Sequence, residues 1–157
     1  MKRLAALFAF FAMTAGLNAQ QWAPVGENIR TPWADEIDPS APLPEYPRPQ
    51  MIRDKWMNLN GLWEYAITPA DAVPEKMEGH ILVPFAVESA LSGVGRAVTE
   101  NDALWYEREF FVPEDWAGQR VILHFGAVDW RAEVFVDEQL AGEHTGGYAP
   151  FSFDITD

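Results

Sequence analysis

The feature of this chain that most constrains its fold is a period-two pattern of apolar residues between positions 121 and 155. Every second residue is apolar in the runs 121–125, 132–136 and 151–155, and turn residues separate the runs. Successive side chains of a strand point to opposite faces, so each run predicts a strand with one buried face. Several such runs in series are typical of an antiparallel β-sandwich or barrel.

Upstream runs extend this prediction to most of the chain. Residues 59–67, 80–83 and 104–111 are predicted strands, and residues 113–118 are predicted to form a turn or one helical turn. The hydrophobic content of 48%, with seven Trp and ten Phe, indicates a packed fold. An aromatic side chain buries about 150–250 Å², so four tryptophans are expected to be mostly core or domain-interface residues: Trp56, Trp63, Trp105 and Trp130.

Residues 1–19 have the layout of a secretory signal peptide. Lys2 and Arg3 precede an apolar run over residues 4–13, and small residues lead to Ala19. A run of this length is too short for a permanent membrane anchor. The chain has no cysteine, which excludes disulfides and a lipid-anchored cysteine. We therefore expect cleavage after Ala19 and a periplasmic or secreted protein that is not bound to a membrane.

The mature chain is predicted to have two parts. Residues 20–50 form a proline-rich extended arm, because proline removes backbone donors that helices and central strands need. Trp33 and Tyr46 are expected to pin this arm to a surface, and residues 51–157 are expected to form the folded domain. The net charge of −13 argues against nucleic acid or an anionic membrane surface as a partner.

The residues alone predict no cofactor, no metal site and no catalytic group. There is no phosphate-binding glycine loop, and His80, His124 and His144 lack the short spacing of zinc ligands. Glu107 and Glu109 would share one face of a strand, about 6.6 Å apart, near the separation of an inverting glycosidase pair. Any Glu-x-Glu on a strand gives that spacing, so a solvated strand face is the preferred interpretation.

Six short pieces, in this order and spacing, resemble the N-terminal sugar-binding domain of glycoside hydrolase family 2, which includes β-galactosidases, β-glucuronidases and β-mannosidases. The pieces are 47–50, 56–63, 83–89, 104–106, 125–129 and 146–148. The resemblance implies an all-β, jelly-roll β-sandwich (galactose-binding-domain-like), followed in family members by an immunoglobulin-like domain and a (β/α)₈ barrel. The barrel carries the two glutamates of a retaining hydrolase.

The chain departs from the family pattern in two places. After the strand at 132–136 the family usually has Asn-Gly, whereas this chain has Asp137-Glu138, a poorer fit to a tight primed turn. The sequence also stops at Asp157, just after a predicted strand, where the family domain continues. We therefore expect the sandwich to be incomplete at its C-terminal end.

The resemblance also suggests where a sugar would lie. The first domain of family members lends loops to the rim of the active site, and the loop 92–102 is the best candidate for that role here. Asn101, Asp102 and Trp105 are the predicted sugar-proximal residues, with Asn101 first among them. No catalytic residue can be carried over, because the barrel is not in this sequence.

These observations predict the non-catalytic carbohydrate-binding domain of an exported family 2 glycoside hydrolase. The parent would hydrolyse a β-galactoside or β-glucuronide with its barrel domain and would also have an immunoglobulin-like domain, and this chain alone is expected to be inactive. A free-standing carbohydrate-binding module and an inactive fragment of a truncated gene are the alternatives.

Overall fold

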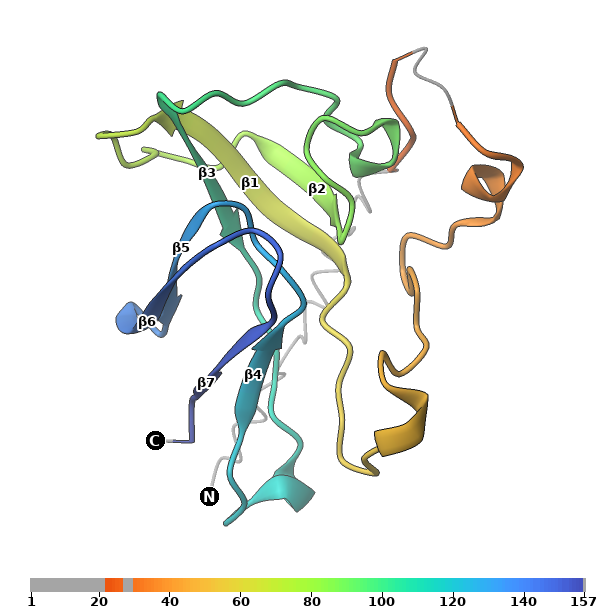
Figure 1. Cartoon of the computed structure of the whole chain (residues 1–157), viewed down its shortest axis with the longest axis vertical. Helices are drawn as coiled ribbons and strands as arrows, with labels where there is room; N and C mark the ends of the chain where they lie inside the picture. The colour runs from red at the N-terminus through yellow and green to blue at the C-terminus, as the bar shows by residue number, and fades with distance from the viewer. Residues whose placement is uncertain (1–21, 27–29, 157) are drawn as a thin grey trace, which may run out of the picture. The chain divides into compact units, whose positions relative to one another are not determined.

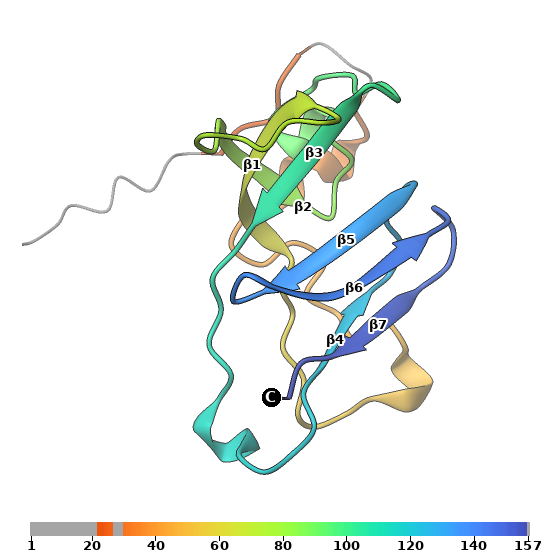
Figure 2. The same cartoon turned by 90° about the vertical axis from the view of Figure 1, so that its left-hand side faces the viewer.

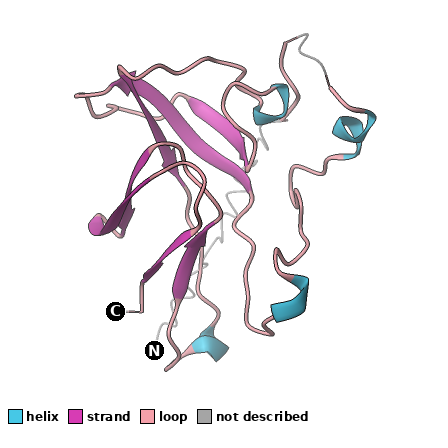
Figure 3. Cartoon of the chain, viewed as in Figure 1, coloured by secondary structure: helices cyan, strands magenta, loops and turns pink. Residues whose placement is uncertain are grey.

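The structure, a computed structural model, describes residues 22–26 and 30–156. Over these ranges the regular elements are antiparallel β-strands and short 3₁₀ helices, as Figure 3 shows. No helix among these residues is long and apolar enough to cross a membrane. The predicted all-β class is thus confirmed, while the predicted signal peptide at residues 1–19 lies outside the described residues.

The chain divides into two compact units. Of the described residues, 22–26, 30–47 and 58–108 form the first unit, and 48–57 and 109–156 form the second. The helices η1 (Pro32–Glu36) and η3 (Ala90–Ser92) lie in the first unit, and η2 (Pro49–Met51) and η4 (Glu114–Trp116) lie in the second. The predicted turn over residues 113–118 contains η4, which is one helical turn.

A three-stranded antiparallel sheet forms the first unit, with the strand order β2-β1-β3 (Figure 1). The strands are β1 (Gly61–Pro69), β2 (Gly79–Val83) and β3 (Asp102–Glu107). Ile81 and Leu82 are both fully buried. Because neighbouring side chains of a strand point to opposite faces, the sheet is covered on both faces at β2.

The described part of the proline-rich segment up to Pro47 belongs to this first unit and packs within it. The Trp22 indole N–H donates to the Leu91 carbonyl at 3.1 Å, and the Asn58 amide donates to the Leu43 carbonyl at 3.0 Å. Pro42 is buried. Trp33 is largely exposed, so the expectation that it pins the segment is wrong.

The predicted strand over residues 104–111 is too long, because β3 ends at Glu107. The next residue, Arg108, turns its guanidinium back toward β1. Its Nη1 donates to the carbonyls of Leu59 at 3.0 Å and Asn60 at 3.1 Å, and the guanidinium carbon lies 6.0 Å from the centre of the Trp63 ring. Arg108 therefore fixes the start of β1, which the pattern of apolar residues did not indicate.

The second unit contains two antiparallel strand pairs (Figure 2). One pair is β4 (Ile122–Phe125) with β7 (Phe151–Asp154), and the other is β5 (Arg131–Val136) with β6 (Gln139–Thr145). The His144 ring stacks on the Phe151 ring with 4.2 Å between centroids, which places β6 beside β7. Sequence reasoning predicted three of these strands and missed β6.

A tight turn joins β5 to β6. Its central residues, Asp137 and Glu138, have φ angles of 48° and 64°. Two consecutive positive φ angles are the mark of the primed hairpin turn, which favours Asn-Gly. The turn is therefore a tight primed turn, although Asp-Glu fits such a turn less well than Asn-Gly does. Both of its residues adopt an uncommon backbone conformation.

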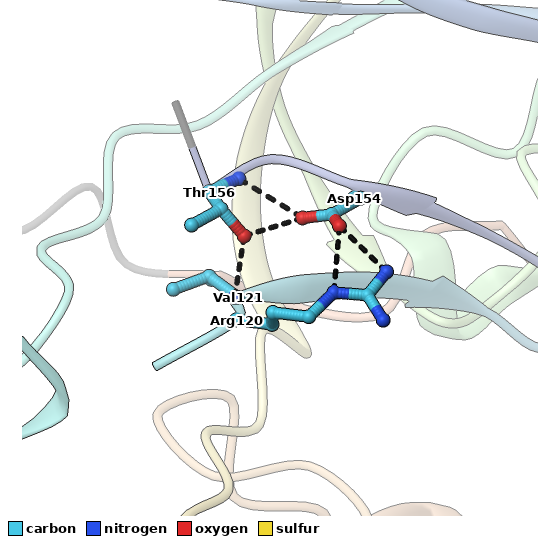
Figure 4. Close-up of polar contacts among 4 residues, drawn as sticks. All are labelled: Arg120, Val121, Asp154 and Thr156. Carbon is cyan, nitrogen blue, oxygen red and sulfur yellow. Dashed lines mark hydrogen bonds and ion pairs between the residues drawn. The ribbon is translucent and has the colours of Figure 1, made fainter. Parts of the chain in front are cut away.

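The pair β4–β7 is closed at its end by a polar network (Figure 4). The Arg120 guanidinium donates twice to one Asp154 carboxylate oxygen, at 2.7 and 2.9 Å. The other oxygen accepts from the hydroxyl and the backbone N–H of Thr156, and the Thr156 hydroxyl accepts from the Val121 N–H at 3.0 Å. The Thr156 and Arg120 hydrogen bonds lower the pKa of Asp154.

Candidate functional site

The loop between β2 and β3 is shaped by hydrogen bonds around its 3₁₀ helix, η3. The Ser89 hydroxyl caps this helix by accepting the N–H of Ser92. Gly93 follows with a φ angle of 79°, a conformation that other residues rarely adopt, and ends the helix. The loop that carries the predicted site residues is therefore held by local chemistry at its start.

Asn101 and Asp102 lie where this loop enters β3. The Asp102 carboxylate accepts the N–H and the hydroxyl of Thr99 at 2.9 and 2.8 Å. The Thr99 hydroxyl and N–H hold the pKa of Asp102 below its usual value. The Asn101 carbonyl accepts the Ala70 N–H at 2.8 Å, and the residue itself is exposed. Asp102 thus closes a turn, which presents Asn101 at the surface beside the β1–β2 connection.

Trp105 lies on β3 and borders an open hollow of about 300 Å³. Its indole N–H donates to the Thr68 hydroxyl at 2.9 Å, and that hydroxyl donates to the Ala72 carbonyl at 2.8 Å. These bonds fix both the indole and the β1–β2 connection that forms the other wall. The hollow is lined by Val73, Pro74, Glu75, Lys76, Met77, Trp105 and Glu107.

The lining combines an aromatic ring, apolar side chains and ionisable groups of both signs. This mixture suits small polar ligands, which need an apolar wall and a few hydrogen-bonding groups for orientation. Lys76 has no ion-pair partner among the described residues. The hollow can therefore offer one ammonium donor and two carboxylate acceptors, from Glu75 and Glu107, beside an indole.

The three predicted site residues do not converge as a single cluster. Trp105 pairs across the sheet with Ala66, and Asp102 pairs with Pro69. Side chains three positions apart on a strand point to opposite faces. Trp105 therefore belongs to the hollow, whereas the Asp102 side chain serves the turn on the other face.

Two further features differ from the sequence analysis. Glu109 lies beyond the end of β3 and in the second unit, so the prediction that Glu107 and Glu109 share a strand face is wrong. Sequence reasoning also missed the wall formed by residues 73–77. Their position between two predicted strands, with Pro74 among them, marked only a turn.

Comparison with known proteins is consistent across sequence and structure. The family described as "Glycosyl hydrolases family 2, sugar binding domain" matches residues 81–157. A β-galactosidase of Thermoanaerobacter pseudethanolicus is 47% identical over 53 residues, which are 34% of this chain and 7% of that protein. A β-glucuronidase of Paenibacillus borealis is 28% identical over 118 residues, covering 71% of this chain and 20% of that protein.

The fold has solved relatives of the same family. The β-glucuronidase of Bifidobacterium dentium, solved with coumarin-3-O-glucuronide, superposes with a TM-score of 0.51 at 32% identity, over 63% of this chain and 17% of that one. The family resemblance and the jelly-roll β-sandwich class predicted from the sequence are thereby confirmed. Residues 81–157 of this chain carry the sugar-binding domain of glycosyl hydrolases family 2.

Proposed function

We propose that this chain binds a β-linked glycoside of the glucuronide or galactoside class and does not hydrolyse it. The observation that carries the proposal is the hollow beside Trp105, which combines an indole face with charged and apolar groups in a family described as sugar binding. Trp105 and Asn101 are the proposed sugar contacts. Asp102 is a positioning residue that holds the turn presenting Asn101.

The proposed ligand class rests on the relatives. Those compared above are named β-glucuronidases and a β-galactosidase, and this chain spans only 7–20% of their lengths. Hydrolysis by a retaining glycosidase needs two carboxyl groups about 5–5.5 Å apart across the scissile bond. We assign that chemistry to the barrel domain of a parent protein that also has an immunoglobulin-like domain, with this chain binding the substrate beside the barrel.

Export is part of the same proposal. The charged start and apolar run before Ala19 support a mature protein that begins at Gln20, in the periplasm or outside the cell. N-terminal sequencing of the protein from its host tests this directly. A soluble cytoplasmic protein that retains Met1 would contradict it.

Isothermal titration of the full chain with methyl β-glucuronide and methyl β-galactoside tests the binding. We expect saturable binding of at least one glycoside, weakened in Trp105→Ala and Asn101→Ala. Two variants are the matched controls. Thr68→Val removes the hydrogen bond to the indole but keeps the ring, and Glu100→Ala changes an exposed neighbour of Asn101. If Trp105→Ala and Asn101→Ala leave glycoside binding intact, the site assignment is wrong. Turnover of a nitrophenyl β-glycoside would contradict the non-catalytic role.

A further inference from the structure

A second group of residues meets at the open end of the β5–β6 hairpin in the second unit. The Gly146 N–H donates to the Trp130 carbonyl at 2.7 Å. The Asp129 carboxylate lies against Gly147, where an added Cβ would be 2.6 Å from Oδ1. Two segments far apart in sequence are therefore held side by side, with Tyr148 immediately after the glycines.

This group leaves two aromatic side chains uncovered. Trp130 is 68% exposed, although it was predicted to be a core or interface residue, and Tyr148 is fully exposed. The neighbouring glycines add no side chains that could cover them. Single exposed apolar residues are normal on a protein surface, but these two lie on segments that the Gly146–Trp130 hydrogen bond holds side by side.

The size of this surface decides between partner classes. One exposed face from each ring offers roughly 150–250 Å² in total, whereas a stable protein interface buries about 800 Å² on each partner. The area is too small for a second copy of the chain or another protein. It suits a pyranose ring, whose apolar C–H face packs on an aromatic ring while its edge presents hydroxyl donors.

The charges around the rings select among sugars. Asp129 offers carboxylate oxygens that accept hydrogen bonds from hydroxyl groups. Arg131, the cation next to Trp130 in sequence, lies 2.7 Å from Glu133 and 3.1 Å from Glu143, so its charge is already paired. With a net charge of −13 for the chain, an anionic uronate would meet repulsion here.

We propose that Trp130 and Tyr148 form a stacking platform for a neutral pyranoside, with Asp129 as the acceptor for its hydroxyl groups. The platform uses none of the residues that line the hollow beside Trp105. It goes beyond the proposed function, and the two sites can be tested separately in one experiment.

The test is ¹⁹F NMR of the full chain labelled with 5-fluorotryptophan, titrated with methyl β-galactoside and, in parallel, methyl β-glucuronide. The Trp130 signal is assigned by its loss in Trp130→Phe. We expect the galactoside to shift the Trp130 signal saturably and the glucuronide to do so only at higher concentration. Trp33, which is 67% exposed, provides a matched control and should not shift.

Three variants sharpen the result. Tyr148→Ala should weaken galactoside binding about 2- to 10-fold, the worth of one aromatic contact, while Trp33→Ala should leave it unchanged. Asp129→Asn should reduce the preference for galactoside over glucuronide. The tryptophan spectrum itself shows that each variant remains folded.

The same titration separates this proposal from the previous one. A shift of the Trp130 signal without a shift of the Trp105 signal supports the platform and contradicts glycoside binding at the hollow. A shift of both signals supports both sites. The platform is overturned if only Trp105 shifts, if Trp33 and Trp130 shift alike, or if the glucuronide binds Trp130 as tightly as the galactoside.

Discussion

One buried hydroxyl organises the loop that carries the proposed site. The Ser92 side chain is fully buried, and its hydroxyl lies 2.8 Å from the Ser89 carbonyl and 3.0 Å from that of Val87, to one of which it donates. It accepts the backbone N–H groups of Val94 at 3.0 Å and Gly95 at 3.3 Å. Buried polar groups that lose their partners are costly, so this hydroxyl is expected to matter more than its size suggests.

Ser92→Ala should therefore lower the free energy of unfolding by about 2–4 kcal/mol, because it leaves two backbone N–H groups without their acceptor. Chemical denaturation with urea measures the change. Ser152→Ala, at an exposed position of β7, is the matched control and should change it by less than about 0.5 kcal/mol. Equal effects of the two variants would show that Ser92 does not organise the loop.

Strand β6 shows how packing between elements decides structure that local pattern does not. Its sequence lacks a regular apolar alternation and contains Gly142, a residue that weakens strands. A Cβ added at Gly142 would lie only 2.2 Å from Cε1 of Phe153 on β7. The glycine is thus explained by the close approach of an aromatic ring, which sequence reasoning cannot supply.

Gly142→Ala should destabilise the chain by about 1–3 kcal/mol, the usual cost of forcing an extra group into a packed contact. The expected cost is smaller in a Phe153→Leu background, since the two positions are in contact and their effects should not add. Gly126→Ala, where an added Cβ meets nothing within 4 Å, is the control. A Gly142→Ala chain as stable as the control would contradict the packing at β6.

The β5–β6 turn makes the opposite prediction, a gain in stability. Asp137 and Glu138 both have positive φ angles, which cost L-residues about 1–2 kcal/mol in the full left-handed conformation. Replacing them with Asn-Gly should raise the free energy of unfolding by about 1 kcal/mol. Asp71→Asn, in the turn after β1, is the control. A loss of stability on Asn-Gly replacement would contradict the primed turn.

At the scale of the whole molecule, four of the described carboxylates favour the folded state in their charged form. Hydrogen bonds from neighbouring groups lower the pKa of these four: Asp38, Glu78, Asp102 and Asp154. A group with a lower pKa in the folded state binds a proton more readily in the unfolded chain. Falling pH therefore favours unfolding.

Thermal stability should consequently be retained above the ordinary carboxyl pKa, 3.8 for Asp and 4.5 for Glu, and fall as the pH drops through the lower folded values. Differential scanning calorimetry between pH 6 and pH 2 measures this. Asp154→Asn removes the group bound by Arg120 and Thr156, so its unfolding temperature should depend less steeply on pH. A dependence as steep as that of the unchanged chain would show that Asp154 does not contribute.

The sequence predicted the class of the molecule better than its details. Period-two apolar runs predicted five of the seven described strands, and a short apolar run predicted β2, since both patterns are properties of each strand alone. The end of β3 depends on Arg108, which turns back to carbonyls near β1. The hollow beside Trp105 depends on which face of β3 meets the β1–β2 connection. Such long-range contacts have no local signal, so the wall at residues 73–77 and the exposure of Trp130 required the structure.

The central claim is that this chain binds a β-glycoside at the hollow beside Trp105. The most direct test is a ¹H–¹⁵N NMR titration of the full chain with methyl β-glucuronide and then methyl β-galactoside. We predict saturable shifts of the amide signals of residues 73–77 and 99–107, because these segments form the hollow and the turn that presents Asn101. Saturating glycoside that leaves both segments unshifted would contradict the claim.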